Sequence, residues 1–335
     1  MTQNRAESRN ESQTSSHMLP SSPFHFVVAE CDGASRKALF EQMKIAAHDG
    51  NLAQLQDQLT QWDTECFNGV LAARKDHLWY RPTVMQEFEI FNEVNHPQEQ
   101  TKHVPTSWHI LNELLVAASR GGQTAVARFL IEERRCSVTS TAVEQAMTAK
   151  AFDTLELFRE HGWNINSPIR NNLCPILRQV VHNEDQVRWC LEHGADPNAR
   201  NKSKTMDVRS YAALIAPFNV LLLLHSHGAN FRDCNSLHCA ARSGRLDVMQ
   251  WLMDEQRFPI NQRELEYDSV LFEDRVSNKL GTALHAAVER DSIKAARFLL
   301  ERGIDVNMPD SVGDTALRRA QQHGRSEMIA LLEAL

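Results

Sequence analysis

Apolar residues near the end of the chain follow the spacing of two short amphipathic helices. Leu284, Ala287 and Val288 are three and four residues apart, which places them on one face of a first helix. A second apolar run covers residues 293–300 and stops before Gly303, a residue type that readily takes the left-handed conformation after a helix. The pattern predicts two short antiparallel helices joined by a turn.

The same pattern recurs along the chain. The tripeptide Thr282-Ala283-Leu284 returns after thirty-three residues at positions 315–317. Such a period predicts a stack of small helical units, each too short to bury its own apolar face. Weaker copies upstream bring the count to about eight units, and they are centred on paired small or apolar residues at 46–47, 117–118, 146–147, 180–181, 212–213 and 240–241.

Two motifs in these units resemble the ankyrin family. Residues 282–285 read Thr-Ala-Leu-His, close to the family's Thr-Pro-Leu-His, and residues 303–307 read Gly-Ile-Asp-Val-Asn, close to its Gly-Ala-Asp-Val-Asn. The resemblance implies an all-α fold, a right-handed solenoid of stacked helix-turn-helix units joined by finger-like turns. It also implies that the threonine caps the first helix and that His285 and His238 join adjacent repeats through hydrogen bonds. Both histidines are therefore expected to be structural.

The last unit has the pattern of a terminal capping repeat, with one apolar face and one polar face. Leu317, Met328 and Leu332 supply its inner face. Arg318 and Arg319 are expected to face water. The solenoid is predicted to cover residues 36–335, after a disordered tail at 1–35 that is rich in Ser, Gln, Asn and Glu.

Composition agrees with a soluble intracellular α-helical protein. The chain has 335 residues and a formal net charge of -7, and its basic residues occur as pairs and not as patches, which argues against nucleic acid as a partner. The apolar run at 220–224 is far shorter than the roughly 20 residues that span a bilayer. We therefore expect a monomer in the cytoplasm or nucleus, with no membrane partner.

No pattern in the sequence predicts catalysis, a metal or a cofactor. The seven cysteines are scattered and odd in number, which favours reduced thiols. Cys234, His238 and Cys239 lie close together but lack a second pair of zinc ligands. Three further histidines precede the closing glycine of a unit, and this recurrence indicates a structural role: His161, His193 and His227.

The repeat pattern is first interrupted between residues 63 and 106. This break carries several aromatic residues, among them Trp79 and Tyr80. One interpretation is a degenerate second repeat with buried aromatics. Another is an aromatic protrusion that supplies interface anchors. An alternative of a different class is a small ligand-binding or catalytic module with polar groups converging in a pocket; its candidate residues are Asp76, His77, Glu87 and Glu89.

A second break, at residues 262–280, is modestly acidic and contains Tyr267 and Phe272. An extended finger loop is the predicted form. It is either a solvated loop without a role or a contact for a basic partner.

The sequence as a whole predicts a non-enzymatic scaffold or adaptor that presents a rigid concave surface to another protein. The side chains expected on that surface come from the first helices and turn tips, with Trp163 included if it is exposed: His48, Asp49, Arg120, Glu289, Arg290 and Trp163.

Overall fold

A computed structural model describes residues 33–67, 108–169, 175–199, 206–266, 268, 273 and 276–335 of the chain. These residues contain no strand, and their α-helices form eight successive pairs. The predicted all-α stack of helix-turn-helix units is therefore confirmed. The first helices of the pairs are α1 (Gly33–Asp49), α3 (Trp108–Gly121), α5 (Ser140–Thr148), α7 (Ile176–Gln179), α9 (Val208–Ile215), α11 (Ser236–Ser243), α14 (Ala283–Glu289) and α16 (Ala316–Gln322). Their partners are α2 (Leu52–Phe67), α4 (Thr124–Glu132), α6 (Phe152–Glu160), α8 (Glu184–Glu192), α10 (Phe218–Ser226), α12 (Leu246–Asp254), α15 (Ile293–Glu301) and α17 (Ser326–Glu333).

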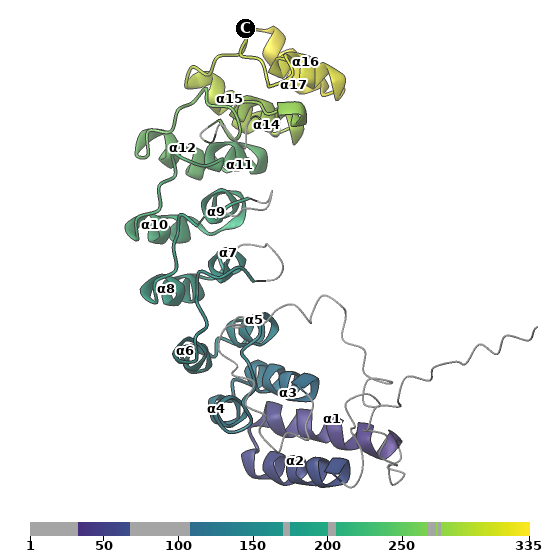
Figure 1. The fold of residues 1–335 in the computed structure, drawn as a ribbon. Coiled ribbons are helices and arrows are strands. Elements are labelled where there is room, and N and C mark those ends of the chain that lie inside the picture. The colour runs from purple at the N-terminus through teal and green to yellow at the C-terminus, as the bar shows by residue number, and fades with distance from the viewer. Residues whose placement is uncertain are drawn as a thin grey trace, which may run out of the picture.

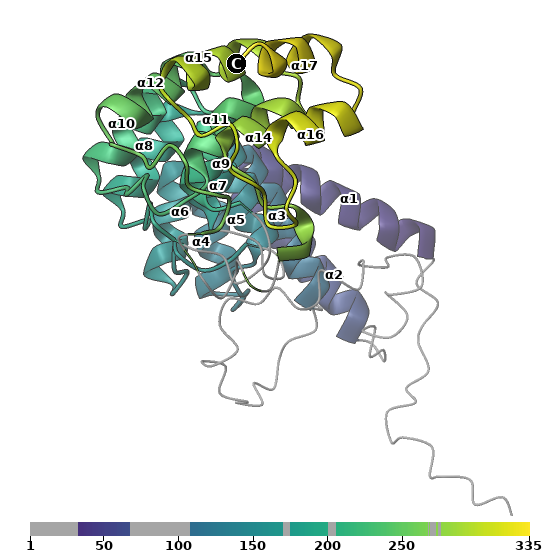
Figure 2. The ribbon, with the colours of Figure 1, turned by 90° about the horizontal axis from the view of Figure 1, so that it is seen from above.

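The pairs are stacked in chain order into a bowed column (Figure 1). The first helices form the inner, concave side of the bow, and the second helices form the outer side. The view along the column shows that α1 and α2 reach beyond the shorter helices stacked on them (Figure 2). Within the part of the chain that the structure describes, no helix is long and apolar enough to cross a membrane.

Hydrogen bonds from a buried histidine join one helix pair to the next. At the start of α14, the Thr282 amide donates to His285 Nδ1 at 3.1 Å. The other ring nitrogen, Nε2, therefore carries the proton and donates to the Asp314 carbonyl of the following unit at 3.1 Å. His238 Nε2 makes the equivalent bond to the Gln262 carbonyl at 2.8 Å. Both histidines thus have the structural role that the resemblance implied.

Asparagine side chains make a second set of links, at the ends of the units. Asn198 donates through Nδ2 to the Gly228 carbonyl and accepts from the Asn230 amide, both at 2.8 Å. Asn166 makes the same pair of bonds to Gly194 and Asp196, one unit earlier. Each asparagine therefore satisfies one backbone carbonyl and one backbone amide of the loop after the next unit's second helix.

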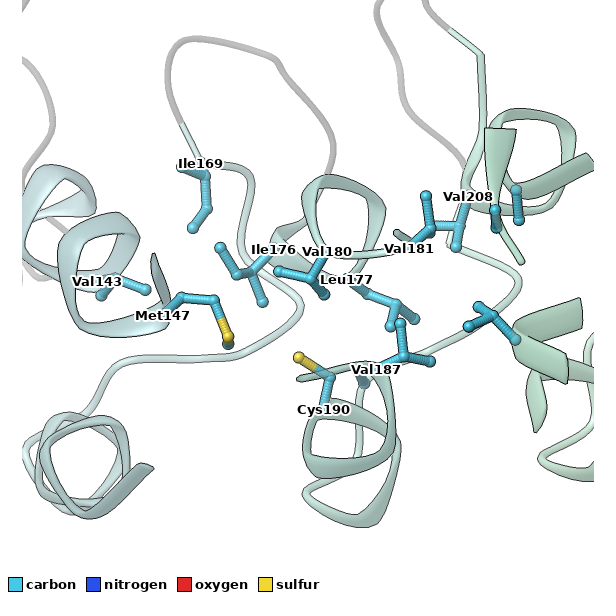
Figure 3. Close-up of a cluster of buried hydrophobic side chains, with 14 of the residues drawn as sticks. Val143, Met147, Ile169, Ile176, Leu177, Val180, Val181, Val187, Cys190 and Val208 are labelled. Atoms are coloured by element: carbon cyan, nitrogen blue, oxygen red, sulfur yellow. The ribbon is translucent and has the colours of Figure 1, made fainter. Parts of the chain in front are cut away.

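One apolar core runs through the whole stack and is continuous around the shortest helix, α7 (Figure 3). Only Ile176–Gln179 are helical there, after Pro175. Val180 and Val181, which the sequence places on a first helix, follow its end and are still buried. The short α7 therefore leaves no gap in the core, because Val180 and Val181 pack where a longer helix would have placed them.

The first two units lie directly against each other. Helices α1 and α3 pack against each other, and a Cβ on Gly121 would lie 1.9 Å from the His48 carbonyl oxygen. Helices α1 and α3 therefore belong to directly stacked units. The interpretation of the break at 63–106 as a degenerate second repeat concerns mainly residues outside the described part and stays a prediction. Helix α2 extends through Phe67 and α3 begins at Trp108; residues 68–107, with Trp79, Tyr80 and the alternative module, lie outside the described residues.

The base of the second break is closed by backbone and side-chain hydrogen bonds. The Glu264 amide donates to the Gly281 carbonyl at 2.9 Å, and the Leu265 amide donates to Asn235 Oδ1 at 2.9 Å. A short 3-10 helix, η3 (Val276–Asn278), precedes the return to α14. The two predicted contact residues of this loop, Tyr267 and Phe272, lie outside the described residues.

Because α1 and α3 approach closely, one methyl group added at their contact is predicted to lower the stability of the stack strongly. Gly121→Ala puts Cβ against the His48 carbonyl, a backbone atom that cannot move without its helix. We expect a loss of about 3 kcal/mol in the free energy of unfolding, which is at the upper end of the usual cost of overpacking a core. Gly122→Ala is the control, because its Cβ meets only the Ala151 methyl at 3.6 Å and the cost is the positive φ of +68°, about 1 kcal/mol. Urea unfolding measures both, and an equal or smaller loss for Gly121→Ala would contradict the packing.

The buried histidines predict that the stack weakens in mild acid. Burial lowers the pKa of His285 to about 4, below the ordinary 6.5. The unfolded chain therefore binds a proton that the folded chain does not, and stability is lost as the pH falls through that interval. Between pH 7 and pH 5 the loss from this residue is about 2 kcal/mol.

His285→Asn is expected to have a shallower pH dependence of urea unfolding than the parent chain between those pH values. The exposed His323 provides the matched control in His323→Asn. Identical slopes for the parent and His285→Asn would show that His285 is not held neutral.

Candidate functional site

The concave side of the stack is lined by equivalent positions of the first helices. The turns after these helices pass through a residue with positive φ in six units: Gly50, Gly122, Lys150, Gly244, Asp291 and Gly324. Two positions before each of these residues lie His48, Arg120, Thr148, Arg242, Glu289 and Gln322. Three of the predicted contact residues, His48, Arg120 and Glu289, therefore occupy the same place in different units.

A groove of about 310 Å³ runs between α1 and α3 on this side. His48, Asp49 and Arg120 all line it, so the structure brings three of the predicted residues together. Its apolar part is formed by Ile45, Val116 and Ala117, and its remaining lining by Glu41, Lys44 and Glu113. The groove therefore combines an apolar strip with charges of both signs.

Ile45 is the most unusual residue of this groove, because its side chain is 60% exposed. The apolar residues beside it, Ala46 and Ala47, are buried in the contact with α3. Sequence reasoning missed Ile45, since an isoleucine in an apolar helix segment is expected to point into the core. Its spacing, three residues before His48, is the signal that could have placed it on the exposed stripe.

The polar side chains of the groove are held by short-range pairs. Lys44 Nζ lies 2.9 Å from Glu41 Oε2, and His48 Nδ1 lies 2.9 Å from Asp49 Oδ1. Arg120 Nε donates to Gln145 Oε1 of α5 at 3.0 Å. These pairs are exposed and weak, so a bound partner can displace them at little cost.

Glu289 and Arg290 lie far from this groove, at the other end of the concave side. Glu289 Oε2 accepts from Arg242 of α11 at 3.1 Å, and Glu289 Oε1 accepts from Arg319 of α16 at 3.0 Å. Its carboxylate is thus already occupied by two inter-repeat ion pairs. Arg290, next to it, is exposed.

Arg319 was expected to face water and is instead buried, which corrects the prediction. Its side chain also bonds to the buried carboxylate of Asp310 and to the Lys279 carbonyl. The fixed partners offset the cost of removing the guanidinium from water.

Trp163 does not contribute to the surface. Its side chain is only 3% exposed and belongs to the continuous core. It follows the closing glycine of α6, where the helical period no longer indicates which way a side chain points. The expectation of a surface role, which depended on exposure, is therefore corrected.

The cysteine and histidine grouping has the features of a packed core and not of a metal site. Cys234 Sγ contacts the Phe231 carbonyl at 3.3 Å, while His238 Nε2 is committed to Gln262. Burial raises the pKa of the Cys234 thiol to about 12 and that of the Cys239 thiol in the same direction. Among the described residues, no three histidine, cysteine, aspartate or glutamate side chains form a group that could hold a metal ion.

Comparisons with known proteins match the same repeat pattern. Family models described as "Ankyrin repeats (many copies)" and "Ankyrin repeat" match residues 284–333 and 232–262. The ankyrin repeat protein FPV018 of Fowlpox virus (strain NVSL) is 24% identical over 245 residues, which are 65% of this chain and 34% of that protein.

Two further relatives match shorter stretches. The ankyrin repeat domain-containing protein 53 of Homo sapiens is 31% identical over 93 residues, 27% of this chain and 15% of that protein. Diacylglycerol kinase iota of Mus musculus is 30% identical over 102 residues, 30% of this chain and 9% of the kinase. The chain thus spans 34% or less of the length of each of these three relatives.

The ion pairs of Glu289 predict that its substitution lowers the stability of the stack, whereas substitution of the adjacent Arg290 does not. Glu289→Gln removes the charge shared by Arg242 and Arg319 and is expected to cost about 1 kcal/mol, a modest value because the carboxylate is 35% exposed. Arg290→Gln is expected to change stability by less than about 0.5 kcal/mol. Thermal unfolding of the two variants checks this, and equal stability would show that the ion pairs contribute nothing.

Proposed function

Because the chain belongs to the ankyrin-repeat family, we propose that it is a non-enzymatic scaffold that binds another protein on its concave side. Ankyrin repeats generally mediate protein–protein interaction. The observation that carries the proposal for this chain is the groove between α1 and α3, where a 60% exposed isoleucine lies among His48, Asp49 and Arg120. An exposed apolar side chain surrounded by polar groups is the arrangement typical of an interface anchor and its rim.

The rigidity of the groove supports this role. Its lining comes from two helices that pack closely enough to require Gly121 at their contact. The side chains are therefore held in place before a partner arrives, and less conformational entropy is lost on binding than with a loop. The partner is expected to be a protein, and not nucleic acid or a membrane, and the chain is expected to act as a monomer in the cytoplasm or nucleus.

The chemistry of the described residues also supports a role without catalysis. His238 and His285 donate to backbone carbonyls between repeats, and burial lowers the pKa of both. Burial raises the pKa of the Cys136 and Cys190 thiols to about 12, which leaves them protonated and unreactive at neutral pH. The alternative module, expected at 63–106, falls mainly on residues outside the described part and stays a prediction.

A charge reversal on each side of the stack tests the proposal. Arg120→Glu changes the concave groove, and Arg297→Glu makes the same change on an exposed residue of α15, on the outer side. Proteins captured by the immobilised chain from cell lysate are quantified by mass spectrometry for the parent and both variants. We expect Arg120→Glu to lower capture of the specific partner about tenfold, as for an interface charge, and Arg297→Glu to leave it unchanged.

Ile45→Asp extends the same test to the apolar strip and is expected to act like Arg120→Glu. Circular dichroism confirms that each variant keeps the helical content of the parent. Equal capture by all variants, or loss only with Arg297→Glu, would place the binding surface elsewhere and refute the proposal.

A further inference from the structure

The middle of the concave side differs from its two ends, because the exposed face of α9 is apolar and aromatic. Tyr211, Leu214 and Ile215 lie on one stripe of this helix at helical spacing. Tyr211 and Leu214 are half-buried and Ile215 is 44% exposed. At the ends of the concave side, charged residues such as Arg120 and Glu289 occur, and the exposed Ile45 lies among them. This contrast identifies a distinct surface at the centre of the stack.

An arginine from the neighbouring unit covers the aromatic ring of this surface. The Arg178 guanidinium of α7 lies over Tyr211, with 4.4 Å between its central carbon and the ring centroid. Within the described residues, the Arg178 side chain makes no hydrogen bond or ion pair, and its Nε is buried without a partner. The Tyr211 hydroxyl also makes no hydrogen bond to any described residue. Two adjacent donors thus lack acceptors.

The other arginines of this side that are held in place have acceptors. Arg242 bonds to the carboxylates of Glu264 and Glu289, and Arg209 bonds to backbone carbonyls and to Asn198. Arg245, on the turn after α11, donates to the Ala212 and Ala213 carbonyls of α9. Of these four arginines, only Arg178 has no side-chain acceptor among the described residues, so its guanidinium is available to a ligand.

The geometry at Arg178 suits a carboxylate. A guanidinium stacked on an aromatic face keeps its N–H groups in its own plane, where a carboxylate can accept two parallel hydrogen bonds. The Tyr211 hydroxyl can donate a third. Leu214 and Ile215, on the same stripe as Tyr211, provide apolar contact for a neighbouring side chain of the ligand.

We infer that the surface formed by Arg178, Tyr211, Leu214 and Ile215 binds a segment of a partner protein in which an aspartate or glutamate lies close to a large apolar residue. This inference rests on the proposed function, because it gives the chemistry of one contact within the concave interface. The carboxylate pairs with Arg178, and the apolar side chain covers Ile215.

A negative charge beside this surface favours a ligand with one negative charge, a carboxylate, over a phosphate or a polyanion. Gln179, the residue after Arg178, donates to the Glu144 carboxylate of α5 at 3.2 Å, so a negative charge already lies on that side. One guanidinium balances one carboxylate, whereas a phosphate group carries nearly two charges and is usually held by several basic residues. The formal net charge of -7 also disfavours nucleic acid.

The core beneath the surface holds it in position although α7 is a single turn long. Val180, Val181 and Val208 are buried where α7 and α9 meet (Figure 3). The backbones that carry Arg178 and Tyr211 are therefore fixed by apolar packing. A partner finds the two donors already placed, which reduces the entropy lost on binding.

The test uses the full chain and a random twelve-residue peptide library displayed on phage. Selected peptides are synthesised, and their affinities are measured by fluorescence anisotropy for the parent, Arg178→Gln, Arg178→Lys and the outer-side control Arg297→Gln. We expect the selected peptides to contain an aspartate or glutamate near an apolar residue. Arg178→Gln is expected to weaken binding about tenfold, Arg178→Lys to restore it only in part, and Arg297→Gln to have no effect.

Substitution of the acidic residue in the best peptide distinguishes the ligand chemistries. Replacement by glutamine is expected to weaken binding to the parent but to have little further effect on Arg178→Gln. Tighter binding of a phosphoserine replacement would overturn the assignment to a carboxylate. Selection of basic peptides would also overturn it.

The same peptides separate this inference from the function on which it rests. Peptides that bind Arg178→Gln as well as the parent but are lost with Arg120→Glu would refute the surface around α9 and leave the concave scaffold intact. Peptides whose affinity changes with neither Arg178→Gln nor Arg120→Glu would refute both the surface around α9 and the concave scaffold. If Arg178→Gln has the same thermal unfolding midpoint as the parent, its weaker peptide binding reflects the lost contact and not a loss of folding.

Discussion

Contact between successive helix pairs is the interaction on which the whole structure depends. A pair of helices of seven to nine residues, as in α14 and α15, has too little apolar surface of its own to form a core. The buried faces are therefore completed by the neighbours, and the core becomes one continuous cluster from α1 to α17. The hydrogen bonds of His238 and His285 lie within these contacts and fix how one unit is placed on the next.

This constraint gives the faces of each helix different roles, some in packing and others in recognition. The faces that meet other units are occupied by packing, so the exposed face of each first helix is the part of it that remains for recognition. His48, Arg120 and Ile45 lie on that face at one end, and Arg178 and Tyr211 lie on it at the centre. The stack offers these side chains on a rigid backbone, and their differences from unit to unit give the surface its specificity.

Local patterns in the sequence predicted the helix pairs, their order and the role of Gly303, because those features depend on residues close in the chain. The role of His285 followed from the family resemblance. The positions of His48, Asp49 and Arg120 followed from the same period. Features that depend on distant partners could not be predicted in this way. The burial of Arg319 requires Asp310 and a glutamate from the preceding unit. The open donors of Arg178 depend on how far neighbouring helices cover them, which no local pattern specifies.

The carboxylate of Glu289 belongs to two interfaces at once, since one oxygen meets α11 and the other meets α16. Repeat stacks are often treated as one-dimensional chains whose stability is a sum of unit energies and nearest-neighbour terms. Here that sum is incomplete, because Arg242, Glu289 and Arg319 form a three-unit interaction in which each contact changes the electrostatic environment of the other. The unit containing α14 is therefore not an interchangeable module: a graft that kept only one of its neighbours would carry over only one of the two ion pairs of Glu289.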